Sequence, residues 1–321
     1  MSRFLLGWAA LAAVALAACS DTQSPDDSPS TPSAPSGTSL PVMESVELTR
    51  PLANAVAGFQ IDLRFVNTPT ASQEQFFRAA AARWESIITG DVPDASGTIP
   101  ARSCGNNFRT PSLQGPFDDL VIHVLLQPID GPGAVLGAAG ACLVRSEGLL
   151  PLYGLMFFDT DDLATIEQAG VLDEVIVHEM GHVLGFSASI WNLGDRELLQ
   201  GTADPRFVGP NAIAAFHDVG GRGATIPLED EFGAGTRFSH WDEGTFDNEL
   251  MTGFISLSGT SPLSVMTIGS VEDLGYQVSY APADRYQVRG PQEREDEEAT
   301  ASAQINLIAR ERLLRPLAVV K

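Results

Sequence analysis

The residues best suited to chemistry are two histidines four positions apart, with a glutamate directly after the first. His178-Glu179-Met180-Gly181-His182 is an H-E-x-x-H motif. On a helix, residues four apart share one face, with Cβ atoms about 6 Å apart, so both imidazoles can bind one zinc ion. Zinc lowers the pKa of bound water to about 7, and Glu179 can accept the released proton and later give it to a leaving amine. The motif therefore predicts zinc-assisted hydrolysis.

A catalytic zinc needs a third protein ligand, which the motif does not supply. Gly185 follows the motif and lets the chain leave the helix with a positive φ, so that a ligand can return from further along. The downstream histidines are His217 and His240. A glutamate ligand, Glu229 or Glu231, would make a different class of zinc hydrolase, although both lie between a proline and a glycine, a poor setting for a helix. The spacing leaves these candidates open.

Apolar periodicity predicts the elements that hold the motif. The expected elements are a strand at 59–65, a helix opened by a Ser72–Gln75 capping box and ended at Gly90, strands at 120–126 and 155–158, the motif helix at 173–184, and a last helix from 262 or 264 to 274. Between 187 and 259 the chain is rich in glycine and short apolar bursts, which predicts an irregular region.

The charge balance excludes one large class of partner. The chain carries a formal charge of −22, and its single lysine is Lys321. Because such a surface repels phosphate groups, we expect no nucleic-acid binding. Apolar residues make up 44% and charged residues 19%, which is the balance of a globular domain.

The N-terminal segment predicts export. An apolar stretch at Phe4–Ala18 follows Arg3 and is too short for a good transmembrane span. Its end, Leu16-Ala17-Ala18-Cys19, resembles a bacterial lipoprotein signal in which Cys19 becomes the lipidated first residue; an ordinary signal peptide is the alternative. We expect residues 1–19 to be this signal and the protein to be lipid-anchored at the bacterial cell envelope.

The two remaining cysteines, Cys104 and Cys142, predict a disulfide. Exported proteins enter an oxidising compartment, where such a bond forms and persists. It would stabilise the fold by roughly 3–4 kcal/mol in the chain-entropy model. A cysteine zinc site is disfavoured because neither residue has a second cysteine nearby.

The segments around the histidines resemble a known family. His178 to Phe186 reads H-E-M-G-H-V-L-G-F, which resembles the metzincin signature without the usual third histidine close by. Ser239-His240-Trp241 and the run N-E-L-M-T-G from Asn248 to Gly253 resemble the leishmanolysin family, in which an insertion separates the second and third zinc histidines. The resemblance covers about 59–280.

Carried over residue by residue, the resemblance implies one zinc ion on His178, His182 and His240, with Glu179 as the catalytic base. Met251 would be the methionine of the Met-turn, an apolar floor under the metal. The implied activity is that of a zinc-dependent endopeptidase acting on extracellular or periplasmic proteins. The implied fold is α+β and metzincin-like, with an N-terminal twisted mixed sheet, the active-site helix, an irregular C-terminal lobe and a cleft between the lobes.

Composition predicts the tether and the tail of the expected domain organisation, and the resemblance implies the catalytic domain between them. The expected parts are a flexible Ser/Pro/Asp-rich tether at 20–45, a catalytic domain at 46–286 with lobes at about 46–186 and 187–286, and an acidic, weakly ordered tail at 287–321. A peptide substrate is expected to pair with an edge strand above the zinc, for which 136–145 and 151–158 are candidates. The expected partners are protein or peptide substrates, and the protein is expected to be a monomer.

Two further features are expected to be structural. Asp159, Asp161 and Asp162 could hold calcium, but they lack the full D-x-D-x-D-G pattern, and an acidic turn that begins a helix is the alternative. His123 lies within the strand predicted at 120–126.

The competing functional class is a non-catalytic surface lipoprotein, an adhesin or binding module on the same fold. Glu179 argues against it because a structural zinc needs no base.

Eukaryotic leishmanolysins are held latent by a propeptide cysteine on the zinc. This chain has no cysteine between Cys19 and Cys104, so that latency device has no obvious residue to use.

Overall fold

The computed structural model describes residues 40–49, 58–231, 237–257, 260–289 and 304–321, all within one compact unit that spans 32–321. The predicted signal peptide with Cys19 and most of the predicted tether lie outside the described residues, as do residues 290–303 of the predicted acidic tail. None of the helices in the described part of the chain has the length and hydropathy needed to span a bilayer.

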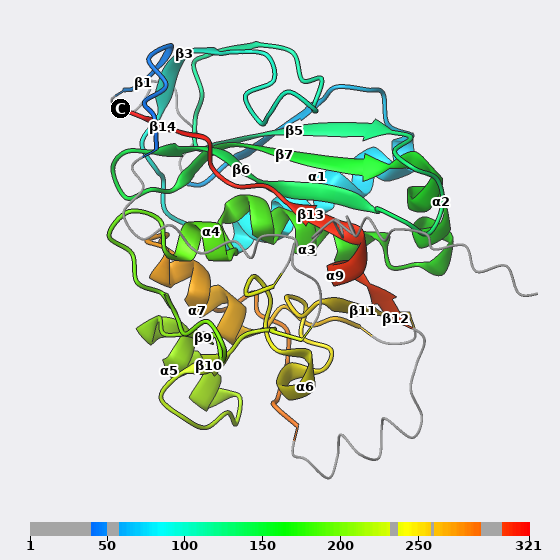
Figure 1. The fold of residues 1–321 in the computed structure, drawn as a ribbon, viewed down its shortest axis with the longest axis vertical. Coiled ribbons are helices and arrows are strands. Elements are labelled where there is room, and N and C mark those ends of the chain that lie inside the picture. Colours follow the sequence, from blue (N-terminus) through cyan, green and yellow to red (C-terminus); the bar gives the residue numbers. More distant parts are fainter. Residues whose placement is uncertain (1–39, 50–57, 232–236, 258–259, 290–303) are drawn as a thin grey trace, which may run out of the picture. The chain divides into compact units, whose positions relative to one another are not determined.

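A six-stranded sheet forms the core of the N-terminal half (Figure 1). Its strands are β2 (Ile61–Phe65), β5 (Leu120–Gln127), β6 (Gly137–Arg145), β7 (Pro151–Asp159), β13 (Glu311–Leu313) and β14 (Ala318–Val320). The order is β13-β6-β7-β5-β2, and β14 also pairs with β6. Because β2, β5 and β7 are parallel while β6 runs antiparallel to β7, the sheet is mixed, as predicted.

The sheet order decides which strand could receive a peptide. β7 pairs with β5 on one side and β6 on the other, so the candidate edge at 151–158 was wrong. β6 is the outer strand of the three and matches the candidate at 136–145. Its outer edge is already occupied by β13 and β14.

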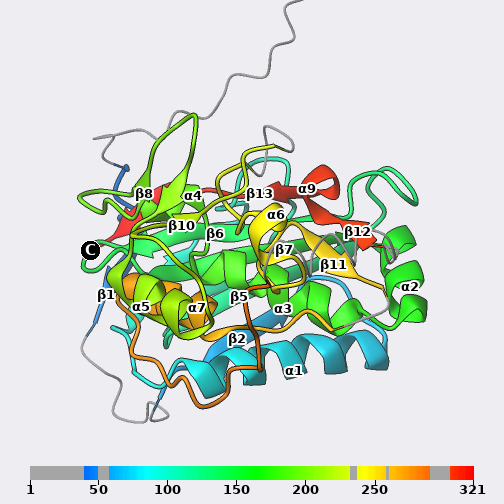
Figure 2. The same cartoon turned by 90° about the horizontal axis from the view of Figure 1, so that it is seen from below.

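Two helices, α1 (Ala71–Ile87) and α3 (Leu172–Leu184), pack together on one face of this sheet (Figures 1 and 2). α1 begins two residues earlier than predicted, because the extended residue Thr70 is the N-cap and forms the capping box with Gln73. Trp84 of α1 is fully buried and donates its indole N–H to the carbonyl of Val177 in α3, at 3.0 Å. Burial of such a side chain stabilises the fold by roughly 1.5–3 kcal/mol.

The acidic turn at Asp159 begins a helix, α2 (Thr160–Ala169). This is the structural alternative that the sequence offered beside a calcium site. Asp159 is the N-cap and accepts an N–H bond from Asp161 through one oxygen. Its other oxygen accepts N–H bonds from Ile129, Asp130 and Gly131. Burial would raise the pKa of Asp159, but these backbone donors lower it below its ordinary value.

The C-terminal half is built from short elements, as its composition predicts. They are α4 (Ala188–Trp191), β8 (Leu199–Gln200), β9 (Arg206–Phe207), α5 (Pro210–Asp218), β10 (Ile226–Pro227), α6 (Glu243–Phe246), β11 (Phe254–Ser256) and α7 (Val265–Asp273). Aromatic packing holds this half together. Trp241 lies with its ring centroid 5.0 Å from that of Phe186 and 5.5 Å from that of Phe207, both edge to face.

The C-terminal segment differs from the weakly ordered tail that the sequence predicts at 287–321. For residues 304–321 the structure shows β12 (Gln304–Asn306) paired with β11, then α9 (Leu307–Arg310), then β13 and β14 paired with β6. Ile305, Leu307 and Val320 are buried in the two cores. The acidic run at 293–298 makes the whole segment resemble a solvated tail, although most residues at 304–321 are apolar. The open edge of β6 supplies backbone partners for it.

The described residues begin with a segment that also joins the core. β1 (Val46–Leu48), β3 (Ala95–Ile99) and β4 (Leu113–Gln114) form a three-stranded sheet. Before β1, Met43 donates its backbone N–H to Val319 at 2.8 Å. The tether predicted at 20–45 therefore meets the folded unit before its predicted end.

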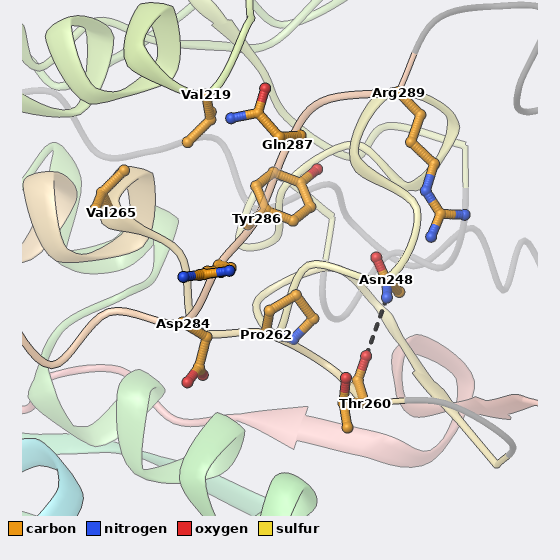
Figure 3. A pocket seen from close by; sticks show the side chains of 10 residues that line it. Val219, Asn248, Thr260, Pro262, Val265, Asp284, Tyr286, Gln287 and Arg289 are labelled. Atoms are coloured by element: carbon orange, nitrogen blue, oxygen red, sulfur yellow. Dashed lines mark hydrogen bonds between the residues drawn. The ribbon is translucent and has the colours of Figure 1, made fainter.

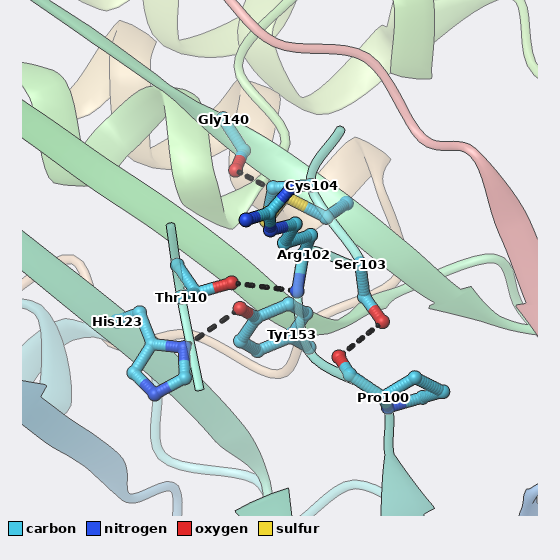
Figure 4. Close-up of a disulfide and its surroundings, with 9 residues drawn as sticks. Pro100, Arg102, Ser103, Cys104, Thr110, His123, Gly140 and Tyr153 are labelled. Carbon is cyan, nitrogen blue, oxygen red and sulfur yellow. Dashed lines mark hydrogen bonds between the residues drawn. A yellow bond between two sulfur atoms is a disulfide. The ribbon is translucent and has the colours of Figure 1, made fainter. Parts of the chain in front are cut away.

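The disulfide predicted between Cys104 and Cys142 is present (Figure 4). It ties the loop after β3 to the middle of β6, with Cα atoms 5.0 Å apart. His123 lies nearby in β5 and is structural, as expected: it is buried, and its Nδ1 lies 2.7 Å from the hydroxyl of Tyr153.

Candidate metal centre

α3 places the two histidines of the motif on one buried face. His178 and His182 are 0% and 1% exposed. The helix ends where predicted, at Gly185, whose φ of +114° is the left-handed conformation that favours glycine. The turn brings the carbonyl of Phe186 back under the helix, where it accepts a hydrogen bond of 2.6 Å from Nδ1 of His182.

Backbone carbonyls fix the tautomer of both histidines. Nδ1 of His178 donates to the carbonyl of Leu250 at 2.7 Å, and Nδ1 of His182 donates to Phe186. Since a carbonyl oxygen only accepts, each Nδ1 carries the hydrogen and each Nε2 keeps a lone pair. Burial lowers the pKa of His182 well below its ordinary value, so that its ring stays neutral.

The third imidazole comes from His240, 58 residues after His182. Its backbone carbonyl accepts an N–H bond from Glu229 at 3.0 Å, and the next residue, Trp241, donates its N–H to the carbonyl of Met251. These bonds and the buried Trp241 ring fix the loop beside α3. The structure therefore brings together the three histidines that the family resemblance implied.

The three Nε2 atoms converge on one point. They lie 3.0, 3.2 and 3.3 Å from one another. Zinc–nitrogen bonds of 2.0–2.1 Å in a tetrahedron would separate two nitrogens by about 3.3 Å. The lone pairs of His178 and His182, whose Nε2 atoms lie 3.0 Å apart, repel one another unless a cation lies between them, so the donor set fits a zinc ion.

A fourth group, Glu311 of β13, reaches the same point. One of its oxygens lies 2.9 Å from Nε2 of His240, and the other lies 3.6 and 3.9 Å from Nε2 of His178 and of His182. The four side chains offer ligand atoms within 4.8 Å of one another. Sequence reasoning missed Glu311, because no motif or spacing distinguishes it and only the pairing of β13 with β6 places it here.

Glu179 lies on the same helix and is 1% exposed. Burial raises the pKa of Glu179 well above its ordinary value, and the negative charge of Glu311 raises it further. A carboxyl beside a metal site can accept a proton from water and return it to a leaving group.

Met251 lies directly behind the histidine pair. A Cβ atom at Gly181, the residue before His182, would lie only 3.0 Å from the sulfur of Met251 and 3.2 Å from the ring of Trp84. The thioether therefore packs against the backbone of α3, and it is fully buried.

A buried carboxylate organises the turn that carries Met251. One oxygen of Glu249 accepts the N–H of Met251 at 2.6 Å. The other accepts the N–H and hydroxyl of Ser264 and the hydroxyl of Thr267, at the start of α7. Thr267 in turn accepts the indole N–H of Trp241 at 2.8 Å. The turn, α7 and the His240 loop are thus one connected network.

The other candidate ligands lie elsewhere. His217 is exposed on α5, with Nε2 2.7 Å from the carbonyl of Gly223. Glu229 is buried, but its oxygens accept backbone N–H groups from Glu231 and Glu243. Neither Glu229 nor Glu231 belongs to the four-residue group at the metal point.

In the part of the chain that the structure describes, the side chains around the metal point are buried from solvent. A hollow of about 720 Å³ lies beside the Met251 turn and is lined by Asn248, Pro262 and Tyr286 among others (Figure 3). Asn248 donates its amide N–H to the carbonyl of Thr260 at 3.0 Å at one wall of this hollow. None of the three histidines lines it.

Comparison with known proteins agrees with this geometry. A family model described as leishmanolysin matches residues 95–287, more than half of the chain. The chain belongs to the leishmanolysin family. The match includes the three histidines and Met251, and it ends before Glu311.

Individual relatives of this leishmanolysin-family chain match its central part. It is 32% identical over 177 residues to a leishmanolysin homolog of Crithidia fasciculata, covering 52% of this chain and 26% of that protein. It is 28% identical to leishmanolysin of Leishmania donovani, over 52% of this chain and 28% of that protein. It is 25% identical to the ciliated left-right organizer metallopeptidase of Xenopus laevis, over 50% of this chain and 25% of that protein. The matched stretch therefore spans about a quarter of the length of these relatives.

Proposed function

We propose that this protein is a zinc-dependent endopeptidase, with His178, His182 and His240 as the zinc ligands and Glu179 as the general base. The observation that carries the proposal is the convergence of three buried Nε2 atoms, within 3.3 Å of one another, beside a buried carboxyl on the same helix. Membership of the leishmanolysin family supports it.

The chain's own residues prepare the site for hydrolysis. When bound, zinc would supply Lewis-acid polarisation of the scissile carbonyl. The carbonyls of Leu250 and Phe186 hold His178 and His182 in the tautomer and orientation that a metal requires. Glu179, with its raised pKa, would take a proton from the attacking water and deliver it to the leaving amine.

The proposal extends to the metzincin-like arrangement of the fold. The substrate cleft would lie between the sheet with α3 and the irregular half that carries His240. Met251 would be the Met-turn residue, an apolar floor rather than a ligand. Its packing against Gly181 and its link to α7 through Glu249 support that role.

We also propose that the protein acts outside the cytoplasm on proteins or peptides, attached to the cell envelope through lipid on Cys19. The support is the signal-like sequence that ends in Cys19 and the disulfide between Cys104 and Cys142, since such bonds persist in oxidising compartments.

The decisive test compares casein hydrolysis by two zinc-loaded proteins, Glu311→Ala and Glu311→Ala/Glu179→Gln. The common background is chosen because the Glu311 carboxylate lies against the imidazoles. Both proteins should bind one zinc ion per chain, and loss of the general base should slow hydrolysis about 10²–10⁴-fold. A zinc-loaded Glu311→Ala protein that cuts nothing across a broad panel of proteins would favour the adhesin or binding-module alternative.

The ligand set is tested with a matched pair of histidine variants. His240→Ala should lose most of its zinc affinity, measured by competition with a chromogenic chelator, whereas His217→Ala should keep it. Retention of zinc by His240→Ala would revive a glutamate ligand from Glu229 or Glu231.

A further inference from the structure

The C-terminal segment runs along the outer edge of β6, where an extended peptide could pair. Glu311, Arg312 and Leu313 pair in parallel with Gly137, Ala138 and Ala139. Backbone bonds close both ends of this pairing: Leu136 donates its N–H to Arg310 at 2.6 Å, and Leu314 donates its N–H to Ala139 at 2.7 Å. These are main-chain bonds of the kind by which a sheet edge takes up an added strand.

The same segment also contacts the other side of the metal centre. β12 pairs antiparallel with β11, which follows the Met251 turn, and Leu307 donates its N–H to Gly253 at 2.9 Å. Between the two pairings, Arg310 forms an ion pair with Asp162 at 2.5 Å. Figure 1 shows this red segment passing from β11 to β6 across α3. It bridges the sheet half and the irregular half of the molecule.

Glu311 is where this strand meets the three imidazoles. Its carboxylate is 0% exposed, and its ion-pair contacts are the Nε2 atoms of His178, His182 and His240. The Nε2 atoms of His178 and His182 carry lone pairs, and a buried carboxylate that faces lone pairs is strongly unfavourable by itself. It becomes favourable when a cation lies between these groups, with the carboxylate as an additional ligand. A catalytic zinc site leaves that position to water or substrate.

We infer that the C-terminal segment is a resident inhibitor of the metal centre. Residues 311–320 occupy the edge of β6 as a peptide would, and Glu311 supplies the fourth zinc ligand from that strand. The inference rests on the proposed function for its zinc, and adds that the site opens only when this segment leaves. The protein is therefore latent in the conformation described and is activated by displacement or removal of its own C-terminal strand.

The first test measures binding rather than turnover. The affinity of zinc-loaded, full-length protein for a tripeptide hydroxamate, a zinc chelator on a peptide, would be measured by calorimetry. If the open form is at most a tenth of the population, Glu311→Ala should bind at least about tenfold more tightly than the wild type. Leu314→Pro, which removes the N–H donated to Ala139, should act in the same direction. Arg312→Ala, an exposed neighbour on the same strand, is the matched control and should match the wild type.

Equal hydroxamate affinity in the wild type, Glu311→Ala and Leu314→Pro would overturn the inference. The proposed endopeptidase function would survive that result, because it depends on zinc binding and on Glu179. Conversely, tighter hydroxamate binding by Glu311→Ala without any proteolysis would uphold the inhibitor and count against the endopeptidase.

The second test follows the strand itself. Amide hydrogen exchange at Leu136 and Leu314 would be compared with and without zinc, because these amides form the bonds between β6 and the segment. Zinc should slow their exchange at least about tenfold in the wild type and in Arg312→Ala, but not in Glu311→Ala. Exchange rates in the wild type that do not respond to zinc would contradict a metal-linked inhibitor.

Discussion

At the scale of single residues, the metal centre depends on buried histidines that backbone groups hold in place. Each motif histidine has a backbone carbonyl on Nδ1, which leaves Nε2 for the metal point. Glu249 has a similar supporting role, further from the metal point. Burial raises its pKa, but hydrogen bonds from Ser264, Thr267 and Met251 oppose that rise, which lets a carboxylate hold the Met251 turn against α7.

Glu249→Gln should destabilise the fold by about 1–3 kcal/mol, because an amide N–H₂ would then face at least one of the four donors that now point at the carboxylate. Urea unfolding of the zinc-free protein measures this. Glu272→Gln is the control, since the hydrogen bond that Glu272 accepts from the Tyr280 hydroxyl is exposed. Equal loss of stability in the two variants would contradict the role of the network.

At the scale of elements, the position of α3 is set by close contact with the sheet. Gly154 of β7 lies under α3, and a Cβ atom there would lie 2.4 Å from a methyl carbon of Val183 and 2.8 Å from the carbonyl oxygen of Gly140. Only glycine permits this approach. The sheet thereby fixes the distance of α3 and its two histidines from β6 and from β13, the strand that pairs with the outer edge of β6.

Gly154→Ala should therefore destabilise the protein by about 1–3 kcal/mol, because the added methyl group must displace Val183 or the β6 backbone. The midpoint of urea unfolding would show it. Gly244→Ala in α6 serves as the control, since a Cβ atom there meets its nearest neighbour at an ordinary 3.6 Å. A stability close to that of the wild type in Gly154→Ala would show that α3 is free to shift.

At the scale of the whole molecule, the acidic composition leaves carboxyls in places where they resist ionisation. Burial raises the pKa of Glu243 to about 8, and burial raises that of Asp119 to about 7. Each pKa is higher in the folded protein than in the unfolded chain. Between the unfolded and the folded pKa of each group, the folded state therefore binds more protons than the unfolded state. The stability that these groups contribute is fully present below about pH 4 and is lost as pH rises through 7 to 8.

Glu243→Gln should make the unfolding free energy less dependent on pH. Because the amide resembles the protonated acid, the variant and the wild type should have similar stability at pH 5, and the wild type should fall below the variant as pH rises to 8. Urea unfolding of both zinc-free proteins at the two pH values tests this, and the difference between them isolates Glu243. Parallel pH profiles would refute the raised pKa.

Local sequence determined the features of this protein that lie within one helix or strand, and those that follow from the number of cysteines. The spacing of His178 and His182 and the stop at Gly185 are of the first kind, because helical geometry acts over short distances. The pairing of Cys104 with Cys142 is of the second kind. The choice of His240 over His217 needed the family resemblance, and hydrogen bonds from Trp241 and Glu229 place it. Glu311 was decided by tertiary structure alone. It follows an acidic run that makes the segment resemble a solvated tail, and only the long-range pairing of its strand with β6 brings its carboxylate to the three imidazoles.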